Sequence, residues 1–220
     1  MKTDTNPHEG LRVSLILTLV GGFLDAYTYL LMGGVFANAQ TGNVVLLALS
    51  LLDIPKTTFF KFLLPILAFL VGVMISELVR ANRSLQERSR WAVVVVAFEV
   101  VVLALVGVFA GVLSPSTVNC VISLIAGLQA SSFKKVRNSP FATTMVTGNL
   151  RSATELAVQF LLKKSPGAHW QALTYLLVVG VFIAGAALGA LAASTLSYAS
   201  IFLCCGLLAV VGLLLLRKKP

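Results

Sequence analysis

Two short segments carry polar side chains suited to binding a solute. The triplet Thr41-Gly42-Asn43 recurs as Thr147-Gly148-Asn149, 106 positions later (147 − 41 = 106). Hydroxyl and amide groups both donate and accept hydrogen bonds. A threonine can also cap the start of a helix, whose free N–H groups form a positive end. The repeat therefore predicts two polar turns, each followed by a short helix, that bind a polar or anionic solute.

Asn38 and Gln40 stand just before the first triplet, in an uncharged segment that begins with Gly33-Gly34. Consecutive glycines break a helix, so we expect non-helical backbone here. Inside a membrane such backbone is tolerated only where it faces protein or water. This favours a binding site at the first triplet, and the alternative is a tight surface loop capped by Thr41.

Asp25, Glu99 and Gln129 lie within apolar segments. Ionisable groups at membrane depth are costly, face the protein interior and mark functional sites, and either carboxyl could carry a proton. Asp25 and Gln129 match in Gly22-Phe23-Leu24-Asp25-Ala26 and Gly127-Leu128-Gln129-Ala130, so we expect them to meet at the interface between two repeats. A structural hydrogen bond between helices is the alternative for each of these groups.

The composition is that of an integral membrane protein. Hydrophobic residues make up 58% and charged residues 11% of the chain, against about 45–50% and about 25% in soluble domains. Six apolar segments are predicted to cross the bilayer. They are residues 11–31, 59–79, 91–113, 118–133, 170–193 and 197–216.

The net charge of +9 does not indicate nucleic-acid binding, because the basic residues flank the spans and form no continuous face with aromatic residues. With six spans, all but Lys56 and Lys61 of the 17 lysines and arginines lie on the side of the N-terminus. The positive-inside rule makes this side cytoplasmic. We therefore predict a multi-pass protein of the bacterial cytoplasmic (inner) membrane with both termini inside. An eight-span alternative, in which the triplets cross the bilayer, would largely abolish this asymmetry.

The predicted fold is an all-α membrane protein, a single domain over residues 1–220 built from two three-helix repeats. Repeat 1 covers about 11–113 and repeat 2 about 118–216, each with a short helix after its Thr-Gly-Asn turn. Three crossings are an odd number, so the repeats would have opposite orientations. Inverted repeats with paired, glycine-interrupted polar segments are typical of alternating-access transporters.

No enzyme signature, cofactor motif or metal-ligand spacing is present. Cys120, Cys204 and Cys205 fall inside apolar spans, and His8 and His169 are isolated. We therefore predict a non-enzymatic protein, without cofactor or metal, whose partners are the lipid bilayer and a small-molecule solute. The leading hypothesis is a secondary transporter of a small polar or anionic solute, and the alternative is a non-catalytic membrane scaffold or assembly protein.

The motifs of the chain resemble those of the YoaK-like family of bacterial membrane proteins, a domain of unknown function. They include Phe36-Ala37-Asn38-Ala39-Gln40, and Thr143-Thr144 before the second triplet. The resemblance covers essentially the whole chain. It implies a six-span inner-membrane protein and no established substrate, cofactor or activity. The sequence departs from the family pattern at Ser131-Ser132-Phe133, where the family more often has a polar pair such as Asn-Ala, followed by basic residues.

Overall fold

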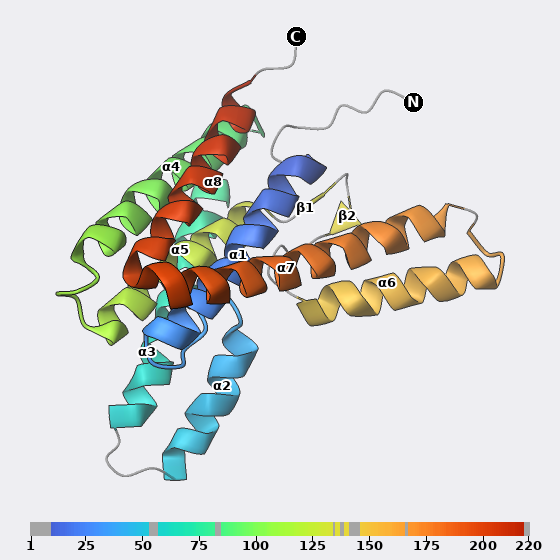
Figure 1. Ribbon diagram of the computed structural model, residues 1–220. Coiled ribbons are helices and arrows are strands. Elements are labelled where there is room, and N and C mark those ends of the chain that lie inside the picture. Colours follow the sequence, from blue (N-terminus) through green and yellow to red (C-terminus); the bar gives the residue numbers. More distant parts are fainter. Residues whose placement is uncertain are drawn as a thin grey trace.

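The computed structural model describes residues 10–52, 57–81, 85–133, 135–136, 139–140, 146–165 and 167–217. Within these residues the chain is helical apart from short connections and one small pair of strands (Figure 1). In chain order the elements are α1 (Leu11–Leu31), α2 (Gln40–Leu49), the 3₁₀ turn η2 (Ser50–Leu52), α3 (Thr57–Ala81), α4 (Leu85–Phe109), α5 (Pro115–Ser132), β1 (Lys135–Val136), β2 (Ser139–Pro140), α6 (Val146–Leu161), α7 (Ala168–Leu196), the 3₁₀ turn η3 (Ser197–Ser200) and α8 (Ile201–Leu216).

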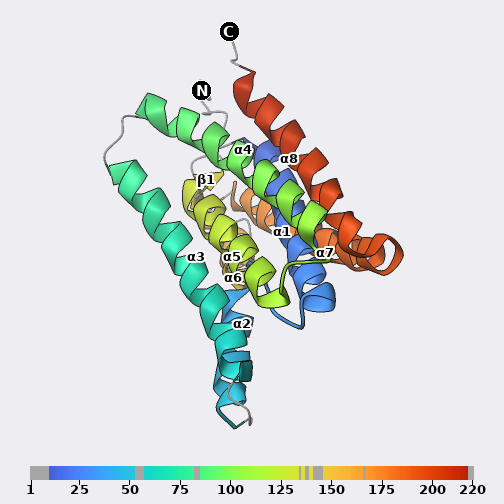
Figure 2. The ribbon, with the colours of Figure 1, turned by 90° about the vertical axis from the view of Figure 1, so that its left-hand side faces the viewer.

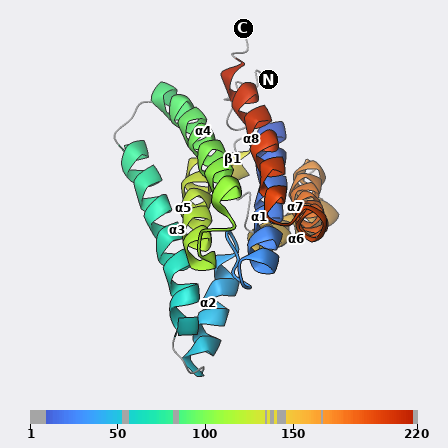
Figure 3. The ribbon, with the colours of Figure 1, turned by 60° about the vertical axis from the view of Figure 1, so that its left-hand side comes forward.

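The helices α1, α4, α5 and α8 form the centre of the molecule. α8 packs against both α4 and α1, and α4 packs against α5. Figure 2 and Figure 3 show these helices running side by side. The α2–α3 pair extends from this centre in one direction and the α6–α7 pair in another (Figure 1). Two pairs of helices thus flank the centre and extend from it in different directions.

Glycines allow α1 and α7 to cross in backbone contact. A Cβ atom on Gly22 would lie only 2.2 Å from the carbonyl oxygen of Phe182, and one on Gly185 would lie 2.2 Å from that of Leu19. Contacts under 3.0 Å do not occur between real Cβ atoms and backbone. Any larger residue would therefore force the two helices apart, which is how small residues let membrane helices approach closely.

The crossing of α3 and α5 has the same construction. A Cβ atom on Gly127 would lie 2.2 Å from the carbonyl oxygen of Phe69, and one on Gly72 would lie 2.1 Å from that of Leu124. In both crossings each glycine faces the carbonyl of the residue three positions before the partner helix's glycine. The two crossings therefore share one register.

The outward faces of the long helices are apolar. Exposed leucine, valine, phenylalanine and methionine side chains recur every three or four residues, so they share one face of each helix. On α3 they include Leu67, Leu70, Met74 and Leu78, and on α4 Val94, Phe98, Val101 and Leu105. Soluble monomers rarely expose continuous apolar surface of this kind, and it suits contact with lipid.

Four stretches of the described residues are long and apolar enough to cross a membrane, judged by length and composition: Leu11–Leu31, Thr58–Ala81, Arg90–Phe109 and Ala168–Leu216. The last of them contains both α7 and α8, which the sequence predicted as two separate spans. The short predicted span 118–133 falls on α5, which ends at Ser132 and is not among the four. The protein is thus a helical membrane protein with four candidate spanning stretches.

The structure corrects the predicted role of the Thr-Gly-Asn triplets. Each triplet forms the first turn of a helix and not a turn before it, since α2 begins at Gln40 and α6 at Val146. Ala39 is the N-terminal cap of α2, with no side-chain capping bond, so the predicted capping by Thr41 is wrong. Thr41 and Thr147 are both exposed.

The connection between α5 and α6 contains an element that the sequence did not predict. β1 and β2 pair antiparallel, with Lys135 opposite Pro140 and Val136 opposite Ser139. Backbone groups outside helices still need hydrogen-bond partners, and here two short segments of the connection supply them to each other.

Candidate functional site

Asp25 joins α1 to the start of α2. Its Oδ1 accepts a hydrogen bond of 2.7 Å from the backbone N–H of Asn38, just before α2 begins. The Asn38 side chain in turn donates through Nδ2 to the carbonyl of Gly21 on α1 at 3.1 Å. Both side chains are buried. The carboxylate of Asp25 therefore lies beside the positive N-terminal end of α2, where the sequence predicted a bound polar or anionic solute.

The chain can return to Asp25 because Gly33 and Gly34 follow α1 with φ angles of 86° and 81°. Glycine adopts this left-handed conformation without steric cost. Asn119 of α5 donates through Nδ2 to the carbonyl of Met32 at 2.9 Å, which ties the end of α1 to α5. The predicted break of the first span at the two glycines is confirmed.

Asn43 and Gln40 hold the connection between α1 and α2. Asn43 accepts from the Phe36 N–H at 2.9 Å and donates to the Phe36 carbonyl at 2.7 Å, as well as to Gln40 Oε1 at 2.9 Å. Gln40 Nε2 donates to the Ala37 carbonyl at 2.8 Å. Gly42 is required here because a Cβ atom would lie 2.9 Å from the Phe36 ring. These three predicted site residues therefore organise the loop backbone.

The second triplet is placed differently. Asn149 is buried like Asn43, whereas nothing lies within 4 Å of a Cβ atom placed on Gly148. Arg151 donates to Glu155 at 2.7 Å on the exposed side of α6, one helical turn further along the chain. The connection before the second triplet, residues 141–145, lies outside the described residues. The two triplets thus share the buried asparagine and differ in the packing of the glycine.

Glu99 and Gln129 form a second buried polar contact, between α4 and α5. Gln129 Nε2 lies 2.9 Å from Glu99 Oε1 and 3.0 Å from Oε2, so one amide group donates to both carboxylate oxygens. Glu99 is 1% and Gln129 2% exposed. A carboxylate at this depth needs such a donor, because an unpaired charge in an apolar interior is very costly.

The predicted contact between Asp25 and Gln129 is therefore wrong, because each side chain bonds to a different residue. The amide of Gln129 reaches Glu99 and the carboxylate of Asp25 reaches Asn38. The reason lies in packing, since α5 packs on α3 and α4 but touches α1 over only a small area. Both groups do face the protein interior, as expected for ionisable or strongly polar residues in a membrane helix.

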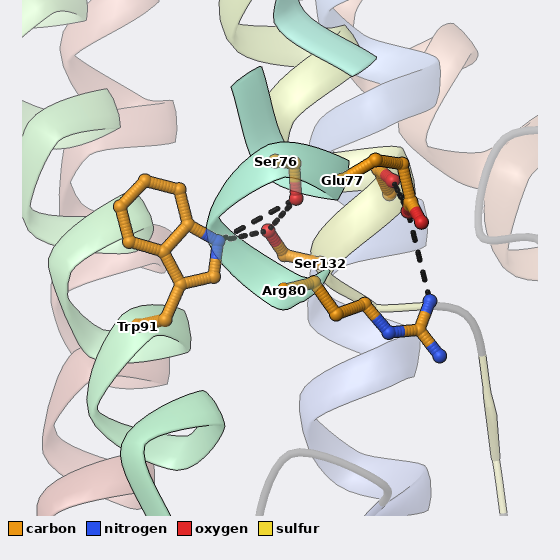
Figure 4. Close-up of polar contacts among 6 residues, drawn as sticks. Ser76, Glu77, Arg80, Trp91 and Ser132 are labelled. Atoms are coloured by element: carbon orange, nitrogen blue, oxygen red, sulfur yellow. Dashed lines mark hydrogen bonds and ion pairs between the residues drawn. The ribbon is translucent and has the colours of Figure 1, made fainter. Parts of the chain in front are cut away.

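A third polar group links α3, α4 and α5 near the end of α3 (Figure 4). The Trp91 indole donates to Ser132 Oγ at 3.1 Å, and Ser132 Oγ lies 3.0 Å from Ser76 Oγ. Ser131 donates to Glu77, whose carboxylate also lies 3.6 Å from Arg80. Glu77, which was not among the predicted site residues, thus joins α3 to α5, while Trp91 joins α4 to both of these helices.

Several buried polar residues were not predicted from the sequence. Thr18 on α1 and Asn119 and Ser123 on α5 are fully buried. A signal for them exists, because Asn119 and Ser123 are four residues apart and so share one helix face. Thr18 and Ser123 are separated by the same number of positions as Gly22 and Gly127 (123 − 18 = 127 − 22 = 105). Within the described residues, no three His, Cys, Asp or Glu side chains gather into a group that could hold a metal ion.

Comparison with known proteins agrees with this helical membrane architecture. A transmembrane protein of Bacillus subtilis (strain 168), UPF0700 transmembrane protein YoaK, is 29% identical over 146 residues, which cover 64% of this chain and 64% of the relative. The chain thus spans less than two thirds of the length of this curated relative. No solved structure matches. The family model described as "Protein of unknown function (DUF1275)" matches residues 13–214, so the chain belongs to this family, as its motifs suggested.

Proposed function

We propose that the protein is a secondary transporter of a small polar solute, built from two inverted repeats with its binding site between them. The observation that carries the proposal is the pair of glycine crossings with one register, α1 on α7 and α5 on α3. If α1, α2, α3 and α4 correspond in turn to α5, α6, α7 and α8, the two crossings are equivalent contacts related by the repeat. In each, the first helix of one repeat packs on the third of the other.

The remaining helix contacts support the same correspondence. α1 packs on α8 as α5 packs on α4, and α2 packs on α3 as α6 packs on α7. The contacts α4–α8 and α1–α5 join corresponding helices directly. A pseudo-two-fold axis would therefore pass between them, close to the buried polar groups on α1, α4 and α5. Transporters with inverted repeats place their solute and ion sites at this interface.

Charge supports an inside location for both termini. The start of α1, the end of α3, the start of α4 and the end of α8 lie toward one end of the molecule (Figure 2, Figure 3). These helix ends carry Arg12, Arg80, Arg90 and Arg217. Basic residues mark the cytoplasmic side of a membrane protein, so we assign this end to the cytoplasm of a bacterial inner membrane.

Reporter fusions test this orientation. Tags after Lys2 and after Pro220 should both report the cytoplasm, and a tag near Lys56 should report the outside. One proposed span separates Lys2 from Lys56, and five separate Lys56 from Pro220. A tag near Arg88 should also report the cytoplasm, and an outside location there would exclude the six-span arrangement. Accessibility of single engineered cysteines to an impermeant thiol reagent, in a variant lacking Cys120, Cys204 and Cys205, provides an independent measurement.

The alternative is a membrane scaffold, and one observation favours it. Asn38 donates to the Gly21 carbonyl of α1, while Gln40 and Asn43 donate to loop carbonyls. Part of the predicted site therefore holds the loop and helices in place. A scaffold needs no solute, whereas a transporter does. The two candidates therefore differ in whether a small molecule binds the isolated protein.

Substitution of Asp25 by Asn separates the two functions. Purified protein is first screened for thermal stabilisation by a solute library, where a ligand at 100 times its Kd adds about 2.7 kcal/mol. Hits are then measured for uptake into proteoliposomes. We expect the Asp25→Asn variant to stay folded, since an amide oxygen can still accept from the Asn38 N–H, and to lose uptake. Exposed Glu155→Gln is the matched control and should transport normally. Absence of any saturable stabilisation or uptake by the native protein would leave the scaffold.

A further inference from the structure

The outer end of the α6–α7 pair, away from the other helices (Figure 1), carries two adjacent lysines. Lys163 and Lys164, which we call the basic turn, follow directly after the end of α6. Lys163 has a φ angle of 55°, a left-handed conformation that favours glycine over lysine. Its N–H donates to the Phe160 carbonyl at 2.9 Å, and the Lys164 N–H donates to the Gln159 carbonyl at 3.0 Å. Strained backbone is common at functional sites, so the basic turn is a candidate binding surface.

The charges of the basic turn are not neutralised within the part of the chain that the structure describes. No ion pair there involves Lys163 or Lys164, and the carboxylate of Glu155 on α6 pairs with Arg151 instead. Both lysine side chains are exposed. Two neighbouring positive charges without an acidic partner attract anionic groups from outside the protein.

Three aromatic rings lie beside the basic turn. The centroid of the Phe160 ring on α6 lies 4.7 Å from that of His169, and the His169 centroid lies 4.9 Å from that of Trp170 on α7. Trp170 is 69% exposed. Tryptophan is enriched where a membrane meets water, because its indole ring has an apolar body and one polar N–H group. The end of the α6–α7 pair thus combines positive charge with an exposed interfacial ring.

α6 has one polar and one apolar stripe on its exposed side, besides the face with Asn149 and Ala153 that is buried. Residues three, four, seven or eleven positions apart share a face of a helix. The polar stripe consists of Arg151, Glu155 and Gln159, and the apolar stripe of Leu150, Ala157 and Leu161. α2, in contrast, contains no charged residue. Helices divided in this way bind where lipid meets water, which places α6 at a membrane surface.

The apolar side chains around the basic turn favour a lipid over a soluble acidic partner. Leu161, Leu162 and Leu173 are all exposed beside the lysines and Trp170. The acyl chains of a lipid would cover these leucines while its headgroup meets the lysines, because a lysine extends its charged end from apolar surface toward the headgroups. An acidic soluble protein or a nucleic acid would neutralise the charge and leave the leucines in water.

We propose that the basic turn binds the headgroups of anionic phospholipids, with Lys163 and Lys164 supplying the positive charge and Trp170 lying at the level of the headgroups. The inference goes beyond the proposed function, because lipid binding does not require transport. It shares with that function only the orientation, in which the basic turn faces the cytoplasmic leaflet. Anionic lipids of this leaflet attract basic segments next to the membrane.

Fluorescence quenching of Trp170 by lipids tests the proposal. The chain has two tryptophans, so Trp91→Phe leaves Trp170 as the single indole. The full-length variant is placed in vesicles of phosphatidylcholine and phosphatidylglycerol in equal amounts, with a quencher near the headgroup of one lipid or the other. We expect the phosphatidylglycerol quencher to bind beside Trp170 about fivefold more tightly, the effect of one lysine near an anionic surface. High salt should reduce this preference, because the charges are exposed.

Charge variants show whether the basic turn causes the preference. Lys164→Gln should reduce it, and Lys163→Gln combined with Lys164→Gln should abolish it. Arg151→Gln is the matched control, because it removes one positive charge from the polar stripe of the same helix, and it should keep the preference. Equal quenching by the two lipids with both lysines present, or a preference that survives the loss of both, overturns the proposal. So does the absence of quenching by either lipid, which would place Trp170 in water.

Thermal unfolding of the protein with both tryptophans provides a second measurement, which does not depend on Trp91→Phe. Purified protein in a neutral detergent is mixed with phosphatidylglycerol, phosphatidylcholine or inorganic phosphate. We expect phosphatidylglycerol to raise the unfolding temperature in a saturable manner, and the combined Lys163→Gln and Lys164→Gln variant to lose this rise while Arg151→Gln keeps it. A rise of the same size with phosphatidylcholine would identify lipid contact without charge recognition, and one with inorganic phosphate a site for a free anion. Either result overturns the proposal.

Discussion

Replacing Gly72 or Gly127 by alanine is expected to destabilise the protein strongly. A Cβ atom at Gly72 would lie 2.1 Å from the Leu124 carbonyl oxygen, and one at Gly127 2.2 Å from the Phe69 carbonyl oxygen. Backbone atoms cannot move aside as a flexible side chain can. α3 and α5 would have to separate along their whole crossing, at a cost of about 1–3 kcal/mol or more. Detergent-solubilised protein should show a much lower unfolding temperature.

Gly180 and Gly206 provide matched controls, because they also lie within helices and nothing lies within 4 Å of a Cβ atom placed on either. Alanine there should leave the unfolding temperature unchanged or raise it, since alanine favours helix over glycine by about 1 kcal/mol. Equal effects at Gly72 and Gly180 would contradict the packing described for the α3–α5 crossing. Alanine at Gly22 or Gly185 should resemble alanine at Gly72, because the α1–α7 crossing has the same register.

The sequence predicts a membrane protein and the approximate positions of its helices, because both follow from where apolar residues are concentrated. Apolar runs of spanning length need only the hydrophobicity of lipid to be recognised. The break at Gly33-Gly34 was equally local, since positive φ angles are a property of single glycine residues. The packing partners of Gly22 and Gly127 were not predictable, because they depend on which helix of the other half each one meets.

If the two halves are the repeats that we propose, the motif that paired Asp25 with Gln129 was aligned one position out. Matching Ala26 with Ala130 places Asp25 opposite Gln129 (130 − 26 = 129 − 25 = 104). The glycine crossings match Gly22 with Gly127 instead (127 − 22 = 105), which places Asp25 opposite Ala130. One position in a helix rotates a side chain by about 100°. This shift turns Gln129 away from the position that corresponds to Asp25, and Gln129 points to Glu99 on α4.

The prediction that Thr41 caps α2 was wrong for a different reason. Threonine before an apolar run is a normal start signal for a helix. Here the side chains that fix the start of α2 come from elsewhere, namely Asp25 of α1 and Asn43 within α2 itself. A contact between Asp25 and the residue thirteen positions later cannot be read from local patterns, because the chain must first reverse direction at Gly33-Gly34.

Replacing Gln129 by leucine should be strongly destabilising, while the additional replacement of Glu99 by leucine should restore much of the loss. Gln129 Nε2 donates to both oxygens of Glu99, which is 1% exposed. Without this donor the carboxyl group stays buried and unpaired, and removing one partner of such a contact costs about 1–3 kcal/mol, more for a charged group. Removing both partners can be nearly neutral when the apolar replacements fit. Thermal unfolding of both single variants and the double variant in one detergent measures the coupling between them.

Glu99→Gln serves as the conservative control for this cycle. An amide oxygen can still accept from Gln129, so the unfolding temperature should fall much less than in Gln129→Leu. The unfolding temperature of the double variant relative to Gln129→Leu shows whether the two side chains depend on each other. If the double variant unfolds below Gln129→Leu, the two side chains contribute independently, and the hydrogen bonds between α4 and α5 do not hold Glu99. If the double variant recovers while uptake by the Glu99→Gln variant is lost, then Glu99 is retained for transport, because an apolar pair would hold the helices equally well.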